Sequence, residues 1–142
     1  MRNKFLTCLW VICGLALSGL ATQSMATGSP GAFQSIIKNQ MSAFRTGNAE
    51  MAFSFASNDL KRRFQSPSVF MEMVKQGYQP VYRPQSVTFG ALRDTKTGPV
   101  QEVYVTGPKG ENWLALYSFE QQDDGSWRIS GCYLTKSPGL SA

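Results

Sequence analysis

The apolar residues that follow residue 32 repeat at helical spacing. Six positions at i, i+3, i+4, i+7, i+8 and i+11 carry five apolar side chains and one glutamine: Phe33, Ile36, Ile37, Gln40, Met41 and Phe44. Residues at this spacing lie on one face of a helix, so the pattern predicts a helix with a buried face. Gly47 is placed to end that helix, and Asn48 is placed to cap the next one.

Three shorter helices are predicted to follow. The first starts after Asn48, and the second restarts at Ser57. Ser66 and Pro67 mark the start of the third, because a hydroxyl can cap a helix and proline fits its first turn. Gly77 is the predicted end of that helix. Apolar residues recur at three- and four-residue spacing through these segments: Ala49, Ala52, Phe53, Ala56, Leu60, Phe64, Phe70, Met73 and Val74.

The pattern changes from helical to strand-like after Gly77. Residues 78–84 contain two prolines, so this segment is predicted to be extended and outside the centre of any sheet. Four strand-like runs follow, separated by turns rich in glycine, proline and aspartate: 85–93, 99–106, 111–121 and 126–134. Short turns make consecutive strands antiparallel neighbours. Helices followed by a strand meander are typical of an α+β fold.

The third strand-like run is apolar on both faces between residues 113 and 119. A strand of this kind lies in the middle of a sheet that is covered on both sides. One face is expected to pack on the helices. The other face must meet a second layer, a partner or a ligand, and it is therefore the main indication of function in the strand pattern.

The first residues have the three parts of a secretory signal. Arg2 and Lys4 give a positive start, residues 5–20 are almost uninterruptedly apolar, and small residues at 24 and 26 suit a cleavage site after Ala26. A second possible site lies after Ala21. The alternative is an uncleaved anchor, but the run is short for a membrane-spanning helix, which needs about 20 apolar residues. The chain is accordingly predicted to be periplasmic or secreted.

The chain divides into a signal peptide at 1–26, a flexible leader at 27–32 and a single domain at 33–142. A domain of this length can bury a core without disulfides. Two of the three cysteines lie in the signal, which leaves Cys132 alone. We favour a buried, inert thiol, and an intermolecular bridge or a reactive thiol are the alternatives.

Charge and the lack of histidine exclude several classes of function. The formal net charge is +5, and removing Arg2 and Lys4 with the signal leaves +3. The basic residues are scattered apart from 61–63, so no stripe for nucleic acid is predicted. The chain contains no histidine, which excludes Ser-His-Asp and Cys-His mechanisms and zinc sites with histidine ligands. No metal, cofactor or, after cleavage, membrane association is expected.

The opening helix with residues 43–48, the Ser-Pro-led helix and the meander resemble the nuclear-transport-factor-two-like (SnoaL-like) superfamily. That resemblance implies helices packed on a curved four-stranded antiparallel sheet, together forming a cone. At closer range the chain resembles a bacterial family catalogued as domain of unknown function 4864. Four stretches carry this resemblance: 52–57, 77–84, 113–117 and 125–132. It implies a fold and no catalytic residues. The superfamily often has a short hairpin before its last helix, whereas 58–65 is predicted to be helical.

Some relatives in that superfamily are isomerases and dehydratases that use an inward carboxylate and a tyrosine donor. Glu102 and Tyr104 are the corresponding pair here, since residues two apart on a strand share a face. In the alternative interpretation, Val103 and Val105 mark the core face. Glu102 then lies in water, and Tyr104 is half-exposed.

An aromatic set offers a ligand pocket instead. Tyr78, Tyr82, Trp113 and Tyr117 are suited to line a small-molecule site, with Arg83 supplying a charge for a carboxylate. The alternative is that the rings only cover the open end of the sheet and Arg83 lies at a solvated rim.

The leading hypothesis is a non-catalytic exported module that binds a small apolar ligand or an envelope protein through the second face of the sheet. Pairing of two such faces in a homodimer is a variant of this hypothesis. The alternative is an isomerase, dehydratase or hydrolase that uses Glu102 and Tyr104. A purely structural accessory of a larger complex is a third hypothesis, which the sequence does not separate from the first.

Overall fold

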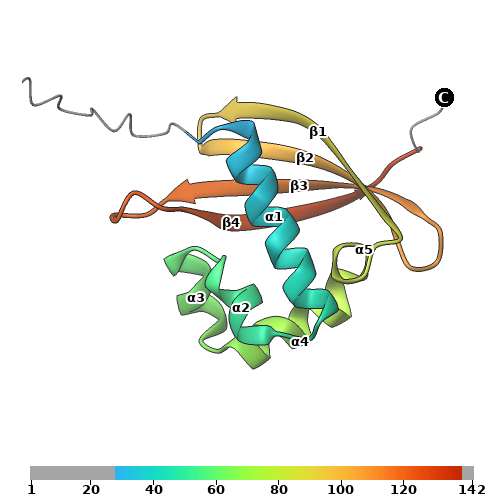
Figure 1. The fold of residues 1–142 in the computed structure, drawn as a ribbon, viewed down its shortest axis with the longest axis horizontal. Coiled ribbons are helices and arrows are strands. Elements are labelled where there is room, and N and C mark those ends of the chain that lie inside the picture. Colours follow the sequence, from blue (N-terminus) through green and yellow to red (C-terminus); the bar gives the residue numbers. More distant parts are fainter. Residues whose placement is uncertain (1–27, 139–142) are drawn as a thin grey trace, which may run out of the picture.

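Five helices precede four strands in the computed structural model, which describes residues 28–138. Figure 1 shows their order: α1 (Pro30–Arg45), α2 (Ala49–Ser54), α3 (Asn58–Phe64), α4 (Pro67–Gly77), α5 (Gln79–Tyr82), β1 (Ser86–Thr95), β2 (Gly98–Thr106), β3 (Asn112–Gln121) and β4 (Trp127–Lys136). The predicted α+β class is confirmed. The predicted signal peptide lies outside the described residues.

The strands form one antiparallel sheet in the order β1-β2-β3-β4. The strand that is apolar on both faces, β3, therefore lies inside the sheet, as its sequence predicts. The register shifts between Phe89 and Leu92 on β1, and again between Ser118 and Phe119 on β3. Such irregularities increase the local twist and bend of a sheet.

Side-chain caps start the four longer helices, three of them at residues that the sequence predicts; α1 starts at Pro30, within the segment 27–32 that was expected to be a leader. The side chains of Ser29, Asn48, Ser57 and Ser66 each accept a hydrogen bond from a backbone N–H in the first turn. These bonds satisfy donors that have no partner inside a helix. Gly47 has a φ of +71°, the left-handed conformation expected where the first helix ends.

The prediction that residues 78–84 are extended is wrong, because α5 occupies most of this segment. Pro80 lies in the first turn of α5, where its missing N–H costs no hydrogen bond. The N–H groups of Val81 and Tyr82 both donate to the carbonyl of Tyr78, at 3.0 and 2.9 Å. Helix α5 ends before the second proline, since Arg83, which precedes it, has non-helical dihedral angles, a φ of −144° and a ψ of 71°.

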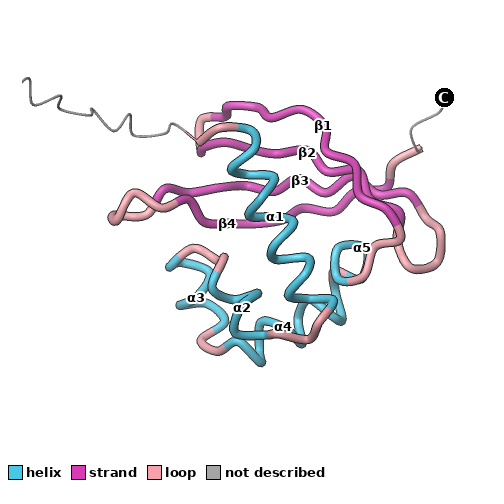
Figure 2. The backbone as a smooth tube through the Cα atoms, in the orientation of Figure 1, coloured by secondary structure: helices cyan, strands magenta, loops and turns pink. Residues whose placement is uncertain are grey.

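The helices lie on one side of the sheet, and two hydrophobic clusters form the core. Figure 1 shows α1 running across the strands, while α2, α3 and α4 lie together on the β4 side, and Figure 2 separates the magenta strands from the cyan helices. The sheet cluster joins residues 33–41 of α1 to the inner face of the strands: Phe33, Ile37, Met41, Val81, Val103, Val105, Ala115, Tyr117, Phe119 and Ile129. The helical cluster joins the C-terminal half of α1 to α2 and α4: Ala43, Phe44, Ala52, Phe53, Ala56, Phe70, Met71 and Val74.

Within residues 28–138, no helix is long and apolar enough to cross a membrane.

Candidate functional site

A cavity lies where the two hydrophobic clusters meet. Its volume is about 230 Å³, and its walls come from α1, α3, α4, the segment 78–81, β3 and β4. The lining residues are Gln40, Phe44, Leu60, Arg63, Phe64, Phe70, Met73, Val74, Tyr78, Val81, Tyr117, Ile129, Ser130, Gly131 and Cys132. Most of this lining is apolar. Clefts with apolar walls and a few polar groups are typical of small-molecule sites.

A bulge in β4 brings four consecutive residues, 129–132, to the cavity. In a regular strand, only alternate residues face one side. Here Phe119 pairs with Ile129 and Ser118 pairs with Gly131, so Ser130 is an extra residue on β4. The extra residue bends the strand and turns its backbone towards α3 and α4.

The hydroxyl of Tyr117 is the most unusual polar group in the cavity wall. Tyr117 is only 1% exposed, and its hydroxyl is close to the thiol of Cys132. Apart from this weak thiol contact, the hydroxyl has no hydrogen-bond partner within residues 28–138. Burial, with smaller effects from Cys132 and Tyr78, raises the pKa of Tyr117 well above its ordinary value, so the hydroxyl is protonated at neutral pH.

Cys132 has the properties of an inert thiol. It is a free cysteine, and burial raises its pKa to about 12. Only the thiolate is a good nucleophile, so a thiol with this pKa is unreactive at neutral pH. This favours the buried-thiol interpretation of the sequence over a reactive cysteine.

Helix α3 forms one side of the cavity and is held mainly at its start. None of its residues is buried. The backbone before it is bound to the edge of β4, where Ser57 N–H donates to the carbonyl of Ile129 and Ile129 N–H donates to that of Phe55, both at 2.8 Å. The N–H of Asn58 also donates to Oε1 of Gln122 at 3.0 Å. The structure confirms the helix that the sequence predicts over 58–65.

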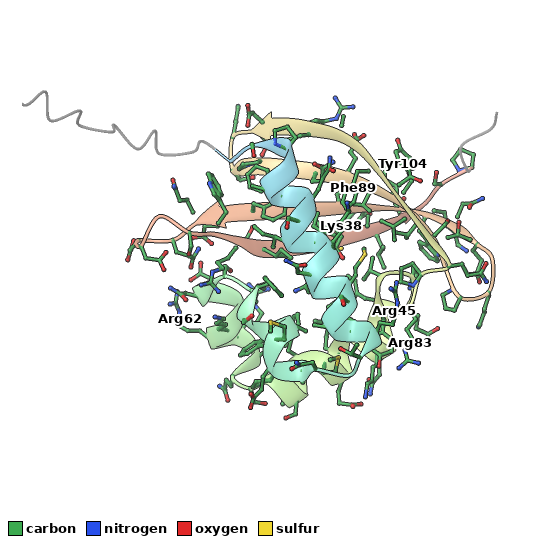
Figure 3. The ribbon with its side chains drawn as sticks, viewed as in Figure 1. Lys38, Arg45, Arg62, Arg83, Phe89 and Tyr104 are labelled. Carbon is green, nitrogen blue, oxygen red and sulfur yellow. The ribbon has the colours of Figure 1, made fainter. Side chains whose placement is uncertain are left out.

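Two of the five predicted ligand-binding residues, Tyr78 and Tyr117, line the cavity. Tyr82 instead packs beside Phe44, with the ring centroids 6.1 Å apart. The guanidinium of Arg83 lies 5.2 Å from the centre of the Tyr82 ring. Figure 3 shows Arg83 near Arg45, at the end of the helical layer opposite α3.

Trp113, the fifth predicted residue, packs on the sheet cluster away from the cavity. The ammonium of Lys136 lies 4.3 Å from the centre of its ring. Trp113 faces the same side of β3 as Tyr117, but it is four residues away. This separation is about 13 Å along a strand, so one small cavity cannot include both rings.

Glu102 and Tyr104 share a face of β2, as predicted, but it is the outer face. Val103 and Val105 are buried on the inner face, and neither Glu102 nor Tyr104 lines the cavity. In Figure 3, Tyr104 lies on the opposite side of the strands from α2, α3 and α4.

Glu102 lies on the outer face, as the alternative interpretation expects, and it is bound there by its neighbours on β1. Its side chain is only 14% exposed, because Nε of Arg93 donates to Oε1 at 2.7 Å. The N–H of Ala91 donates to Oε2 at 3.3 Å. The hydrogen bond from Arg93 is the main reason that the pKa of Glu102 is lowered. A carboxylate that acts as a general base at neutral pH needs a raised pKa and access to the substrate. The pKa of Glu102 is lowered, and Glu102 does not line the cavity.

The sequence patterns missed most of the cavity wall. Gln40 was assigned to the buried face of a helix, where its Nε2 donates to the carbonyl of Ala52 at 3.2 Å. Ser130 and Gly131 were assigned to a regular strand. A glycine inside a strand pattern is a signal for a bulge, and Gly131 gave that signal. Among residues 28–138, no group of three or more histidine, cysteine or acidic residues is placed to hold a metal.

Comparisons with known proteins give a family and no closer relative. No curated protein matches the chain, and no solved structure matches it. The model of one family, described as Domain of unknown function (DUF4864), matches residues 27–142, which include every described helix and strand. The chain therefore belongs to the DUF4864 family.

Proposed function

We propose that this domain is a non-catalytic module that binds a small, mostly apolar molecule in the cavity between α3, α4 and β4. The observation that carries the proposal is that Tyr117 lines this cavity while its hydroxyl is buried without a strong hydrogen-bond partner. A buried hydroxyl left unsatisfied costs about 1–3 kcal/mol. A ligand that accepts a hydrogen bond from Tyr117 recovers part of that free energy.

The size of the cavity sets the size of the ligand. An engineered apolar cavity of about 150 Å³ binds benzene, which has six carbon atoms. At the same packing, the 230 Å³ measured here accommodates about nine non-hydrogen atoms. A monocyclic aromatic compound or a short branched chain has this size. One polar acceptor at the Tyr117 end completes the fit.

The polar groups in the wall support binding over catalysis. The raised pKa values of Tyr78, Tyr117 and Cys132 keep all three protonated at neutral pH, so they are donors and not bases. Among the lining residues there is no carboxylate. The chain has no histidine to serve as a general base.

We also propose that the protein is exported. We further propose that its helices and sheet form the cone of the nuclear-transport-factor-two-like superfamily. The charged start, apolar run and small residues before residue 27 support a cleaved signal, and the family match begins at residue 27. The exported protein then binds its ligand in the periplasm or outside the cell.

Tyr117→Phe tests the hydrogen bond on which the proposal depends. We use acetophenone as the probe, since it has nine non-hydrogen atoms and one carbonyl acceptor. Losing one net hydrogen bond is expected to weaken binding roughly three- to tenfold. The variant should be as stable as the wild type or up to about 1 kcal/mol more stable, because no strong bond is lost in the free protein. Titration calorimetry and urea unfolding measure the two effects.

Tyr133→Phe is the matched control, because Tyr133 is exposed on β4 outside the cavity. It should leave the affinity for acetophenone unchanged. A Tyr117→Phe protein that binds acetophenone as tightly as the wild type, or that loses more than about 1.5 kcal/mol of stability, contradicts the assigned role of the hydroxyl.

Self-association through the outer face of the sheet is a second candidate function. Within residues 28–138 no helix packs on this face, where Tyr104, Leu114 and Leu116 are half-buried and Tyr133 is 66% exposed. Two copies of one face are self-complementary around a two-fold axis. Light scattering over a range of protein concentrations should then give the dimer mass at high concentration, and Tyr133→Asp should shift it towards the monomer. A monomer mass throughout excludes this candidate.

A further inference from the structure

The mouth of the cavity is positively charged. Helix α3 carries three basic residues in its last turn, Lys61, Arg62 and Arg63, against one acidic residue, Asp59. Asp59 is paired with Arg62, which Figure 3 shows at the outer surface of α3. Arg63 lines the cavity, and no ion pair found among residues 28–138 includes it. Its guanidinium is therefore available to a ligand.

The surroundings of α3 neutralise this charge only in part. The pKa of Lys61 is lowered by burial and by the nearby Arg128 guanidinium, which indicates that positive charges repel one another beside the mouth. The guanidinium of Arg128 donates to the carbonyl of Ser54 and, at 3.3 Å, to Oγ of Ser126, and Asp124 is near enough for Arg128 to help lower its pKa. An anion at the mouth relieves this repulsion.

Resting on the proposed function, we propose that the ligand is a small apolar monocarboxylate. Its apolar body lies in the cavity against Phe64, Phe70 and Val74, and its carboxylate lies at the mouth on Arg63. A guanidinium can donate two parallel hydrogen bonds to a carboxylate, and such charge-assisted bonds are stronger than neutral ones. Arg63 is the one basic residue of the lining, so one carboxylate matches it better than a phosphate or a dicarboxylate.

Three probes separate this inference from the proposed function. Acetophenone tests the cavity alone. The isosteric pair 4-acetylbenzoate and 4-acetylbenzamide adds a group at the mouth, and the two compounds have the same shape but differ in charge and in one NH2 group that replaces a carboxylate oxygen. We expect the carboxylate to bind roughly five- to tenfold more tightly than the amide, as for a charge-assisted bond at a partly solvated site. Moderate salt should reduce this difference.

Arg63→Gln is expected to remove the preference for the carboxylate over the amide, and acetophenone measures any separate effect of this wall residue on the apolar body of the ligand. Arg62→Gln is the matched control, because it removes one positive charge from the same helix at a position outside the cavity. It should keep most of the preference. Circular dichroism and urea unfolding confirm that both variants are folded as the wild type is.

Each other outcome has a definite meaning. If acetophenone binds and the acid and amide bind equally, the carboxylate inference is wrong and the proposed function stands. If Arg63→Gln weakens all three probes equally, Arg63 is only part of the wall and the inference is again wrong. If none of the probes binds the wild-type protein, the proposed function and the inference both fail.

Discussion

Phe119→Ala is expected to lower the free energy of unfolding by about 3–5 kcal/mol, the usual range for removing a buried phenylalanine ring. Phe119 is fully buried on the interior strand β3, at 0% exposure. Its ring centroid lies 4.4 Å from that of Phe33, so it joins α1 to the sheet. Truncating this side chain leaves a void. The void stays open because β3 is hydrogen-bonded to a strand on each side and α1 is packed on the sheet. Urea unfolding followed by circular dichroism measures the change.

Tyr133→Ala is the control for this substitution. Tyr133 is an aromatic residue of the same sheet, but it is exposed on the outer face, so its loss should change stability by about 0.5 kcal/mol or less in a monomer. A change below about 1.5 kcal/mol for Phe119→Ala contradicts the central place of this ring in the core.

Gly98→Ala is expected to lower the free energy of unfolding by about 2–3 kcal/mol. Gly98 begins β2 with a φ of +117°, a conformation that residues with a side chain rarely adopt. A Cβ atom there also lies 2.7 Å from the carbonyl oxygen of Phe119, which cannot move without disturbing β3. Backbone strain and a steric clash therefore add. Thermal and urea unfolding should agree on the loss.

Gly110→Ala separates the two contributions. Gly110 also has a positive φ, of +85°, but a Cβ atom at this position meets no atom within 4 Å. The variant should lose about 1 kcal/mol from backbone strain alone. Equal losses at the two glycines mean that the contact with Phe119 is unimportant.

The elements that the sequence predicted well are those with local signals. The caps at Asn48 and Ser66 could be predicted because each depends only on a side-chain oxygen and the free N–H groups next to it in the chain. The turns before β2 and β4 likewise depend on their own residues. The prediction for 78–84 failed because Pro80 is compatible both with an extended segment and with the first turn of a helix. Packing of Val81 into the sheet cluster decided between them.

The candidate site depends on distances that the sequence pattern does not contain. Trp113 and Tyr117 were predicted as one aromatic set, but the pattern does not give their positions along β3, and only Tyr117 lines the cavity. Arg63 was classed with a solvated basic triplet. Its place at the mouth depends on how α3 docks on β4, through hydrogen bonds between residues more than 60 positions apart in the chain.

The central claim is that the space between the two hydrophobic clusters admits a small apolar molecule. Methyl NMR spectra of the protein during titration with acetophenone test it most directly. The account predicts saturable shifts for Val74, Val81 and Ile129, which line the cavity from both clusters, and none for Val69, which is 53% exposed on α4. Unchanged cavity methyls at saturating probe, or shifts confined to Val69, contradict it.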